Sequence, residues 1–172
     1  MRKASQGDNT ALGELYAQFS QKMFSICVRM TGNRTDAEDI LQDAFIAAFN
    51  NLARLRELHL FEAWLRKIVV NECIRFAKNA LSKTPLDENY SETPEANDLN
   101  WLQQISFEQI HEAIKILPNG CREVFNLYVL EDHSHQQIAA GLNISVSTSK
   151  SQYHRARQLL KEHLRKQFIH YG

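Results

Sequence analysis

Apolar residues recur at steps of three and four along almost the whole chain. Between residues 11 and 30 such a stripe consists of Leu12, Leu15, Tyr16, Phe19, Met23, Ile26, Cys27 and Met30. This spacing is the period of an α-helix that buries one face. Similar stripes follow in residues 36–49 and 61–79, and the pattern resumes at residue 110. The sequence therefore predicts an all-α protein built from amphipathic helices.

Glycine, asparagine and hydroxyl residues mark where the first helices end and begin. Gly32 and Asn33 interrupt the first apolar stripe. Thr35 and Glu38 then have the spacing of a capping box, in which a hydroxyl and an acid each bond to a backbone amide at a helix start. The basic and less periodic stretch 52–59 is predicted to be a loop before the third helix.

The third helix carries three aromatic residues among basic side chains. Phe61 and Phe76 are predicted to face the core, because aromatic residues at helical spacing are usually buried, whereas the place of Trp64 is left open. Further along the chain, residues 118–120 (Pro-Asn-Gly) are predicted to form a turn.

Residues 81–108 differ in composition from the rest of the chain. They contain two prolines and carry one basic against six acidic side chains, a net charge of −5. The segment 1–80 carries 11 basic and 9 acidic side chains (net +2), and 109–172 carries 8 and 5 (net +3). We therefore expect two small helical domains, 1–80 and 109–172, joined by an acidic flexible linker over 81–108.

The C-terminal segment has the pattern of a helix-turn-helix. Ser134 and Gln137 form a second capping box ahead of a short apolar helix. Asn143 stands where the end of a helix needs a left-handed residue. Ser145 is a suitable N-cap for a longer, basic final helix. A short helix, a short turn and a longer basic helix in this order are the parts of a helix-turn-helix.

The final helix is predicted to turn one face to the core and the other to DNA. The inward positions are Ser149, Tyr153, Ala156 and Leu160. The other side offers groups that can contact phosphates or base edges in a major groove. These residues are Thr148, Lys150, Ser151, His154, Arg155 and, nearby, Arg157. The charge of the final helix, taken alone, fits an ordinary solvent-exposed helix better than a DNA-binding one. The capped short helix and the turn before it favour DNA binding.

Two N-terminal surfaces also suggest binding. Between residues 54 and 83, basic side chains alternate with aromatic ones, the mixture with which proteins hold single-stranded DNA. The start of the second helix is acidic, with Asp36, Glu38, Asp39 and Asp43. Two explanations of these acids are open. They can stabilise the helix through its dipole, or they can form a docking face for a basic partner.

Motifs of catalysis are missing from the sequence. It contains no G-x-x-x-x-G-K-[ST], G-x-S-x-G or H-E-x-x-H motif, and His133 and His135 lack a third nearby metal ligand. The three cysteines are widely spaced among apolar neighbours and are predicted to be buried thiols. Neither a membrane-spanning run nor a signal peptide is evident. We expect a cytoplasmic, non-enzymatic protein without metal, cofactor, small-molecule substrate or direct membrane insertion.

Taken together, these segments resemble the extracytoplasmic-function (ECF) group of the sigma-70 family. Residues 36–45 resemble that family's region 2.2, and residues 61–71 resemble the end of region 2.3 running into region 2.4. Residues 117–157 resemble region 4. The resemblance covers nearly the whole chain apart from 81–108, and the order and spacing of the motifs make it specific.

The resemblance implies a sigma factor that binds core RNA polymerase and recognises the −35 and −10 elements of promoter DNA. Docking on the clamp of the largest polymerase subunit is implied for Asp36, Glu38, Asp39, Gln42 and Asp43. Contact with the melted −10 element is implied for Arg54, Arg56, Trp64, Arg66, Lys67, Asn71 and Arg75. Contact with the −35 duplex is implied for Thr148, Lys150, Ser151, His154, Arg155 and Arg157. An anti-sigma factor that holds the protein inactive is implied as well.

Two other functions are considered beside this one. A stand-alone helix-turn-helix regulator would need neither the acidic helix nor the basic segment 52–78. A helical adaptor that binds only protein would not need a basic recognition helix. The sequence also departs from the family pattern, with Asn143 where many members have Gly, Ser149 where Val is usual and Gln152 where Arg is common. Because of these departures, the particular −35 sequence that other members recognise cannot be assigned to this chain. The role in −35 recognition is still implied.

Overall fold

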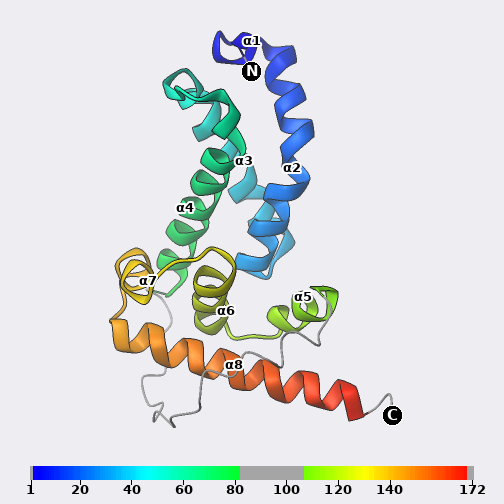
Figure 1. Cartoon of the computed structure of the whole chain (residues 1–172), viewed down its shortest axis with the longest axis vertical. Coiled ribbons are helices and arrows are strands. Elements are labelled where there is room, and N and C mark those ends of the chain that lie inside the picture. The colour runs from blue at the N-terminus through cyan, green and yellow to red at the C-terminus, as the bar shows by residue number, and fades with distance from the viewer. Residues whose placement is uncertain (1, 82–106, 170–172) are drawn as a thin grey trace. The chain divides into compact units, whose positions relative to one another are not determined.

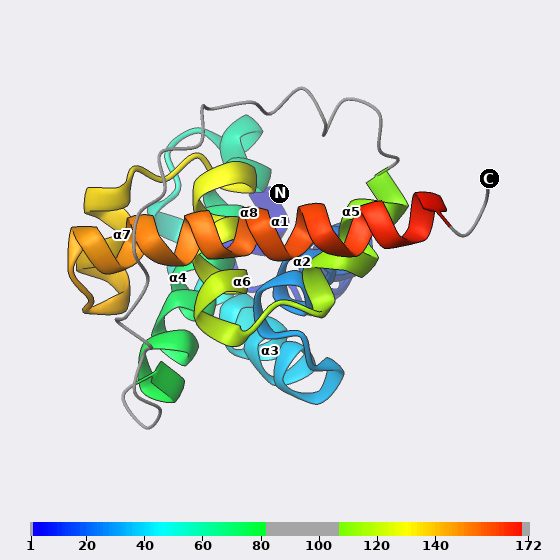
Figure 2. The same cartoon turned by 90° about the horizontal axis from the view of Figure 1, so that it is seen from below.

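The computed structural model describes residues 2–81 and 107–169, and helices dominate both ranges (Figures 1 and 2). The elements are α1 (Arg2–Ser5), α2 (Asn9–Thr31), α3 (Arg34–Asn51), the 3-10 turns η1 (Leu52–Arg54) and η2 (Leu58–Leu60), α4 (Phe61–Leu81), α5 (Phe107–Lys115), α6 (Asn119–Phe125), the π-helical turn η4 (Asn126–Leu130), α7 (His135–Leu142) and α8 (Val146–Ile169). They form two compact units, residues 1–77 and 78–172. The prediction of two all-α domains is confirmed, whereas the predicted linker lies almost wholly outside the described residues.

The first unit packs α2, α3 and α4 around a core of aliphatic and aromatic side chains. The rings of Tyr16 and Phe45 join α2 to α3 at a centroid distance of 4.8 Å. Those of Phe19 and Phe61 join α2 to α4 at 5.3 Å. Further buried side chains are Leu15, Met23, Ile26, Cys27, Met30, Ala37, Ile40, Leu41, Ala44, Ala48, Leu65, Val69 and Cys73. Most of these positions belong to the apolar stripes, so the helical period identified the inward faces.

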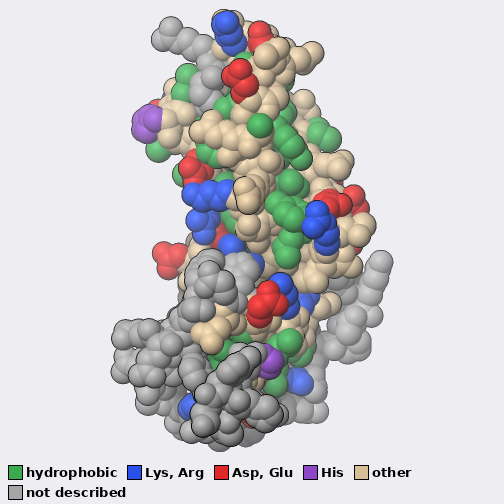
Figure 3. All heavy atoms as spheres, turned by 90° about the vertical axis from the view of Figure 1, so that its right-hand side faces the viewer, with side chains coloured by type: hydrophobic (Ala, Val, Ile, Leu, Met, Phe, Trp, Pro, Cys, Tyr) green, Lys and Arg blue, Asp and Glu red, His purple; other side chains and the backbone are tan. Residues whose placement is uncertain are grey.

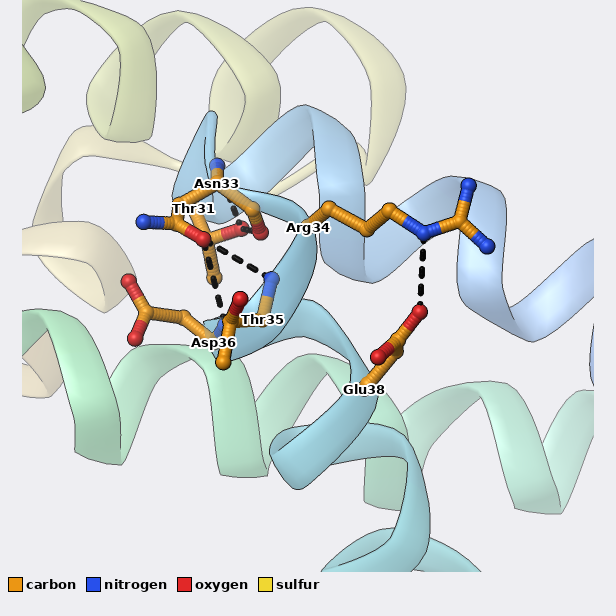
Figure 4. Close-up of polar contacts among 6 residues, drawn as sticks. All are labelled: Thr31, Asn33, Arg34, Thr35, Asp36 and Glu38. Atoms are coloured by element: carbon orange, nitrogen blue, oxygen red, sulfur yellow. Dashed lines mark hydrogen bonds and ion pairs between the residues drawn. The ribbon is translucent and has the colours of Figure 1, made fainter.

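The start of α3 is capped by Asn33. Gly32 ends α2 in the left-handed conformation (φ 68°), which favours glycine, and its N–H donates to the carbonyl oxygen of Val28 at 2.8 Å. The Asn33 Oδ1 atom accepts hydrogen bonds from the backbone N–H groups of Thr35 at 2.8 Å and Asp36 at 3.4 Å (Figure 4). One side chain thus satisfies two of the amides that a helix start leaves without a partner.

The predicted capping box of Thr35 and Glu38 is therefore wrong. Helix α3 begins at Arg34, so Thr35 is already its second residue. The Glu38 carboxylate accepts from Arg34 Nε at 2.8 Å on the solvent side, instead of returning to the cap (Figure 4). The segment 52–59 is also more regular than the predicted loop, because it contains η1 and the start of η2.

The aromatic residues of α4 differ in their surroundings. Phe61 is buried, as predicted, but Phe76 is 36% exposed and the prediction that it belongs to the core is wrong. The buried residues of α4 are Phe61, Leu65, Val69, Val70, Cys73 and Ala77. Counted at 100° per residue, Phe76 falls on the same side of α4 as Leu65 and Val69, so the helical period alone does not account for its exposure. Trp64 is half-buried.

In the second unit α5, α6 and α7 all pack against the long helix α8 (Figures 1 and 2). The predicted turn at 118–120 is instead the start of α6, with Pro118 in the N-cap position. A proline is suited to that place because no backbone N–H is needed before the first turn. Arg122 fixes this start by donating to the carbonyl oxygen of Leu117 at 3.1 Å and to Asn119 Oδ1 at 2.7 Å.

Helices α7 and α8 form the predicted helix-turn-helix. Ser134 and Gln137 make both bonds of the capping box, from Gln137 N–H to Ser134 Oγ at 3.3 Å and from Ser134 N–H to Gln137 Oε1 at 2.8 Å. Asn143 ends α7 in the left-handed conformation (φ 58°). The Ser145 hydroxyl then accepts from the N–H of Thr148 at 2.9 Å and caps α8. The predictions for these residues are confirmed.

Candidate nucleic-acid interface

The predicted DNA-facing residues lie at the start of α8, on the side away from its buried stripe. Lys150 is exposed, and Thr148, Ser151, His154 and Arg155 are partly exposed. The Ser151 hydroxyl donates to the carbonyl oxygen of Thr148 at 3.0 Å. The inward stripe at Ser149, Tyr153, Ala156 and Leu160 is buried as predicted. This part of α8 therefore offers the cationic groups of Lys150 and Arg155 and several hydrogen-bonding groups to an incoming ligand.

Arg157 departs from this surface. It is only 9% exposed, and its guanidinium lies over the Tyr153 ring at 5.8 Å from the centroid. The reason is the helical period, because a residue four positions after Tyr153 returns to the same side of the helix. Arg157 thus stacks on the buried ring, where its contribution is to packing.

His135 extends the same surface, although it was not predicted as a binding residue. Its Nδ1 atom lies 2.9 Å from the hydroxyl oxygen of Ser149, which joins the first residue of α7 to α8. The imidazole stacks on Tyr128 of the turn η4, with 4.4 Å between centroids and 15° between planes. The Tyr128 ring also packs against Tyr153 at 4.6 Å. The aromatic contacts hold the helix-turn-helix together close to its polar face.

The electrostatics of this cluster favour an uncharged His135. Burial lowers the pKa of the imidazole, and the neighbouring charges of Lys150 and His154 lower it further. Burial also raises the pKa of Tyr153, so the ring stays a neutral part of the core. A phosphate placed near Lys150 and His135 would offset the effect of Lys150 and favour the protonated imidazole. The surface is thus suited to an anionic ligand.

An open pocket lies between α3 and α4, beneath the segment that joins them, and is called here the α3–α4 pocket. Its volume is about 510 Å³, within the range of small-ligand sites. It is lined by Ala47, Asn51, Arg54, Leu55, Arg56, Trp64, Ile68, Asn71 and Glu72. The structure thereby brings together Arg54, Arg56, Trp64 and Asn71, four of the residues predicted for −10 DNA. An indole and aliphatic side chains beside two arginines can hold an unstacked base with its phosphates.

The other residues predicted for −10 DNA do not line this pocket. Lys67 is exposed and Arg66 partly exposed on α4. Arg75 forms an ion pair with Glu72 and lies 3.5 Å from Asp43 Oδ2 on α3. Sequence reasoning missed Asn51 and Glu72, which come from different helices and share no motif. Nothing in their local spacing signals that they meet.

The residues predicted for docking lie on one broad side of α3. Glu38, Asp39, Gln42 and Asp43 are exposed and Asp36 is partly exposed. Ile46, one turn further on, is 60% exposed and was not predicted as part of a binding face. A hollow of about 350 Å³ beside this face is lined by Tyr16, Ser20, Gln21, Phe24, Arg34, Glu38, Leu41 and Gln42. Acids around an exposed aliphatic side chain suit a partner that is basic and partly apolar.

Comparison with known proteins matches two parts of the chain to two family models. Residues 15–81 match the family model for sigma-70 region 2, and residues 107–160 match that for sigma-70 region 4. The ECF RNA polymerase sigma factor SigW of Bacillus subtilis is 30% identical over 96% of this chain and 95% of its own length. The ECF RNA polymerase sigma factor SigE of Mycolicibacterium smegmatis is 30% identical over 93% of this chain and 65% of its own length. The chain belongs to the ECF family of RNA polymerase sigma factors. A solved structure, the sigma factor RpoE in complex with the anti-sigma factor NepR from Bartonella quintana, is similar over 89% of this chain and 96% of that one, with 20% identity and a TM-score of 0.49.

Each matched region of this sigma factor contains at least one of the surfaces described above. The region 2 match contains the acidic side of α3 and the α3–α4 pocket, and the region 4 match contains the helix-turn-helix with the start of α8. Figure 3 shows charged side chains of both signs interspersed with hydrophobic ones on the face that it presents. Among the described residues, no helix is long and apolar enough to cross a membrane. Sigma factors bind core RNA polymerase and promoter DNA, and this chain is a transcription initiation factor of that family.

Proposed function

We propose that the two units of this sigma factor divide promoter recognition between them. The start of α8 contacts the −35 duplex, the α3–α4 pocket takes a base of the melted −10 element, and the acidic side of α3 docks on the clamp of core polymerase. The observation that carries the proposal is the pocket, because four of the residues for which the family resemblance implies contact with −10 DNA line it together. A stand-alone helix-turn-helix regulator has no use for such a pocket.

At −35, Lys150 supplies the cation and Ser151 and His154 the hydrogen-bonding groups that suit base edges or phosphates. All three lie in the first half of α8, the half that a recognition helix places in the major groove. Thr148 and Arg155 flank them. His135 contributes from the start of α7, where a backbone phosphate passes in helix-turn-helix complexes.

At −10, Arg54 and Arg56 hold phosphates while Trp64 offers a ring against which an extruded base can pack. Asn71 adds an amide that can both donate and accept, which suits a base edge. Strand separation then follows from binding energy, because each base held in the pocket stabilises the open duplex. Such a mechanism requires no nucleotide hydrolysis, and the proposed protein is not an enzyme.

For docking, Asp39 and Asp43 provide charge and Ile46 provides apolar area on the exposed side of α3. The proposed partner is the clamp of the largest polymerase subunit, which places the protein in the cytoplasm. An anti-sigma factor is proposed to hold the free protein inactive by covering these surfaces. That last step rests on the family resemblance.

The test is run-off transcription with purified core polymerase, this protein and fragmented genomic DNA. We expect promoter-specific transcripts and a complex with core. Lys150→Ala should weaken promoter binding about fivefold or more while core binding persists. Lys161→Ala, the same change three turns further along α8, is the matched control. Charge reversal of Asp39 and Asp43 to Lys should have the opposite effect to Lys150→Ala. It should weaken core binding while contact with the −35 duplex persists. The absence of both transcript and complex would refute the proposal.

A further inference from the structure

His135 is a titratable side chain in the first turn of α7, beside the DNA-facing start of α8. Its ring is half-buried, and Nδ1 lies 2.9 Å from the hydroxyl oxygen of the fully buried Ser149. Among the residues that the structure describes, none forms a hydrogen bond with the other ring nitrogen, Nε2. Nε2 is therefore the atom of this ring that a ligand can use.

The contact with Ser149 suits both protonation states of the ring. A hydroxyl group can donate or accept a hydrogen bond. When the imidazole is neutral, the Ser149 hydroxyl can donate to Nδ1 and the ring proton resides on Nε2. When the ring is an imidazolium, Nδ1–H donates to the Ser149 oxygen instead. Because the stack on Tyr128, at 4.4 Å between centroids, holds the ring plane, a proton can bind without loss of these contacts.

The charges that α8 places around His135 oppose the imidazolium in the absence of DNA. Burial lowers the pKa of the ring, and the charges of Lys150 and His154 lower it further. The positive end of the α7 dipole acts in the same direction, since His135 is the first residue of that helix. The ring is therefore neutral in the unbound protein at neutral pH.

The other groups around the ring do not reverse this balance. Tyr128 of η4 and Tyr153 of α8 present aromatic rings to it. Glu131 and Asp132 precede α7, and neither is among the charges that shift the pKa of His135. A stabilising negative charge must therefore come from a ligand. DNA supplies one, because the helix before a recognition helix crosses the phosphate backbone.

We infer that His135 binds a backbone phosphate of the −35 duplex as an imidazolium, so that −35 binding takes up a proton and strengthens as the pH falls. A phosphate oxygen against Nε2 accepts a charge-assisted hydrogen bond and offsets the charges of Lys150 and His154. The inference rests on the proposed function, because it requires that α7 and α8 bind the −35 duplex. It goes further by making that contact dependent on a proton.

The experiment uses holoenzyme made from core polymerase and the full chain, with the −35 duplex of a promoter found by the run-off assay. Fluorescence anisotropy measures the affinity at about pH 8 and about pH 6. The increase in affinity at the lower pH should be about threefold or more larger in wild type than in His135→Gln, whose amide donates but does not titrate. In wild type the slope of log affinity against log salt should also steepen at the lower pH, by up to about 0.9 for one added phosphate contact.

His163→Gln is the matched control, since it removes an imidazole further along α8 and should keep the pH dependence of wild type. Equal increases in wild type and His135→Gln would overturn the inference. So would a pH dependence that persists in His135→Gln and vanishes in His154→Gln, because the proton would then belong to His154. Thermal melting checks the fold at both pH values, and unfolding at the lower pH would weaken binding rather than strengthen it. Failure of wild type to prefer its −35 duplex over unrelated DNA at either pH would instead refute the proposed function, and this inference with it.

Discussion

The imidazole Nδ1 of His135 lies 2.9 Å from the hydroxyl oxygen of Ser149 and links the two helices of the helix-turn-helix by their side chains. Ser149 is fully buried, and the bond gives its hydroxyl a partner inside the core. Because His135 opens α7 and Ser149 lies in the first turn of α8, the contact fixes the two helix starts relative to each other. These starts are the parts that a helix-turn-helix presents to DNA.

The energy of this contact can be measured with a double-mutant cycle. His135→Phe keeps a ring to stack on Tyr128 but removes the nitrogen, and Ser149→Ala removes the hydroxyl. We expect a coupling free energy of about 0.5–1.5 kcal/mol between the two sites from urea denaturation. Purely additive effects, with coupling below about 0.3 kcal/mol, would show that the bond does not contribute to stability.

The same histidine predicts a dependence of stability on pH. In the unfolded chain the imidazole titrates near its usual pKa of 6.5, whereas burial and then Lys150 and His154 lower its pKa in the folded chain. The unfolded state therefore binds more protons as the pH falls through 6.5, so this contribution to stability is complete above that pH and is lost below it. Wild type should lose more unfolding free energy than His135→Phe between about pH 7.5 and 5.5. Parallel pH profiles for the two proteins would contradict the assignment.

The cap of α3 gives a prediction that separates the structure from the sequence pattern. Asn33→Ala removes the acceptor for two backbone amides and should lower the unfolding free energy by about 1 kcal/mol. Thr35→Ala is the matched control, since the capping box would make it costly but the structure places Thr35 exposed in the first turn. Chemical denaturation of both variants decides the point. A larger effect at Thr35 than at Asn33 would favour the capping box.

The features that could be predicted from the sequence are those that depend on helical period and on residues close together in the chain. The helix-turn-helix followed from Ser134, Asn143 and Ser145, because each of these residues acts on backbone groups within four positions of itself. The capping box at Thr35 and Glu38 was predicted wrongly for the same reason. Asn33 and Thr35 can each cap the start of a helix, and the turn at the preceding Gly32 selects Asn33. Phe76 was placed in the core because it is an aromatic residue at helical spacing, but spacing does not tell whether a neighbouring helix covers that turn of α4.

The pocket and the His135 contact depend on helix packing, which periodicity does not specify. One signal was present: Ser149 is polar at an inward position, so it needs a partner in the core. Its identity, a residue 14 positions away on another helix, follows only from the packing of α7 on α8. For Glu72 no such signal exists, because an acid on the side of a helix looks like any solvated residue until the facing helix is in place.

Cys121 is expected to be an unreactive thiol. It is fully buried, its Sγ–H donates to Gln152 Oε1 at 2.9 Å, and burial raises its pKa to about 11 against the opposing charge of Arg155. At about pH 8 only roughly one molecule in a thousand would carry the thiolate, the form that reacts. N-ethylmaleimide should therefore leave Cys121 unmodified in the native protein and label it rapidly in urea, as read by peptide mass spectrometry. A thiol introduced at the exposed α7 position by Ala140→Cys is the control and should react at once. Native labelling of Cys121 within about tenfold of the rate at that control thiol would show that α6 and α8 separate readily, contrary to the packing described here.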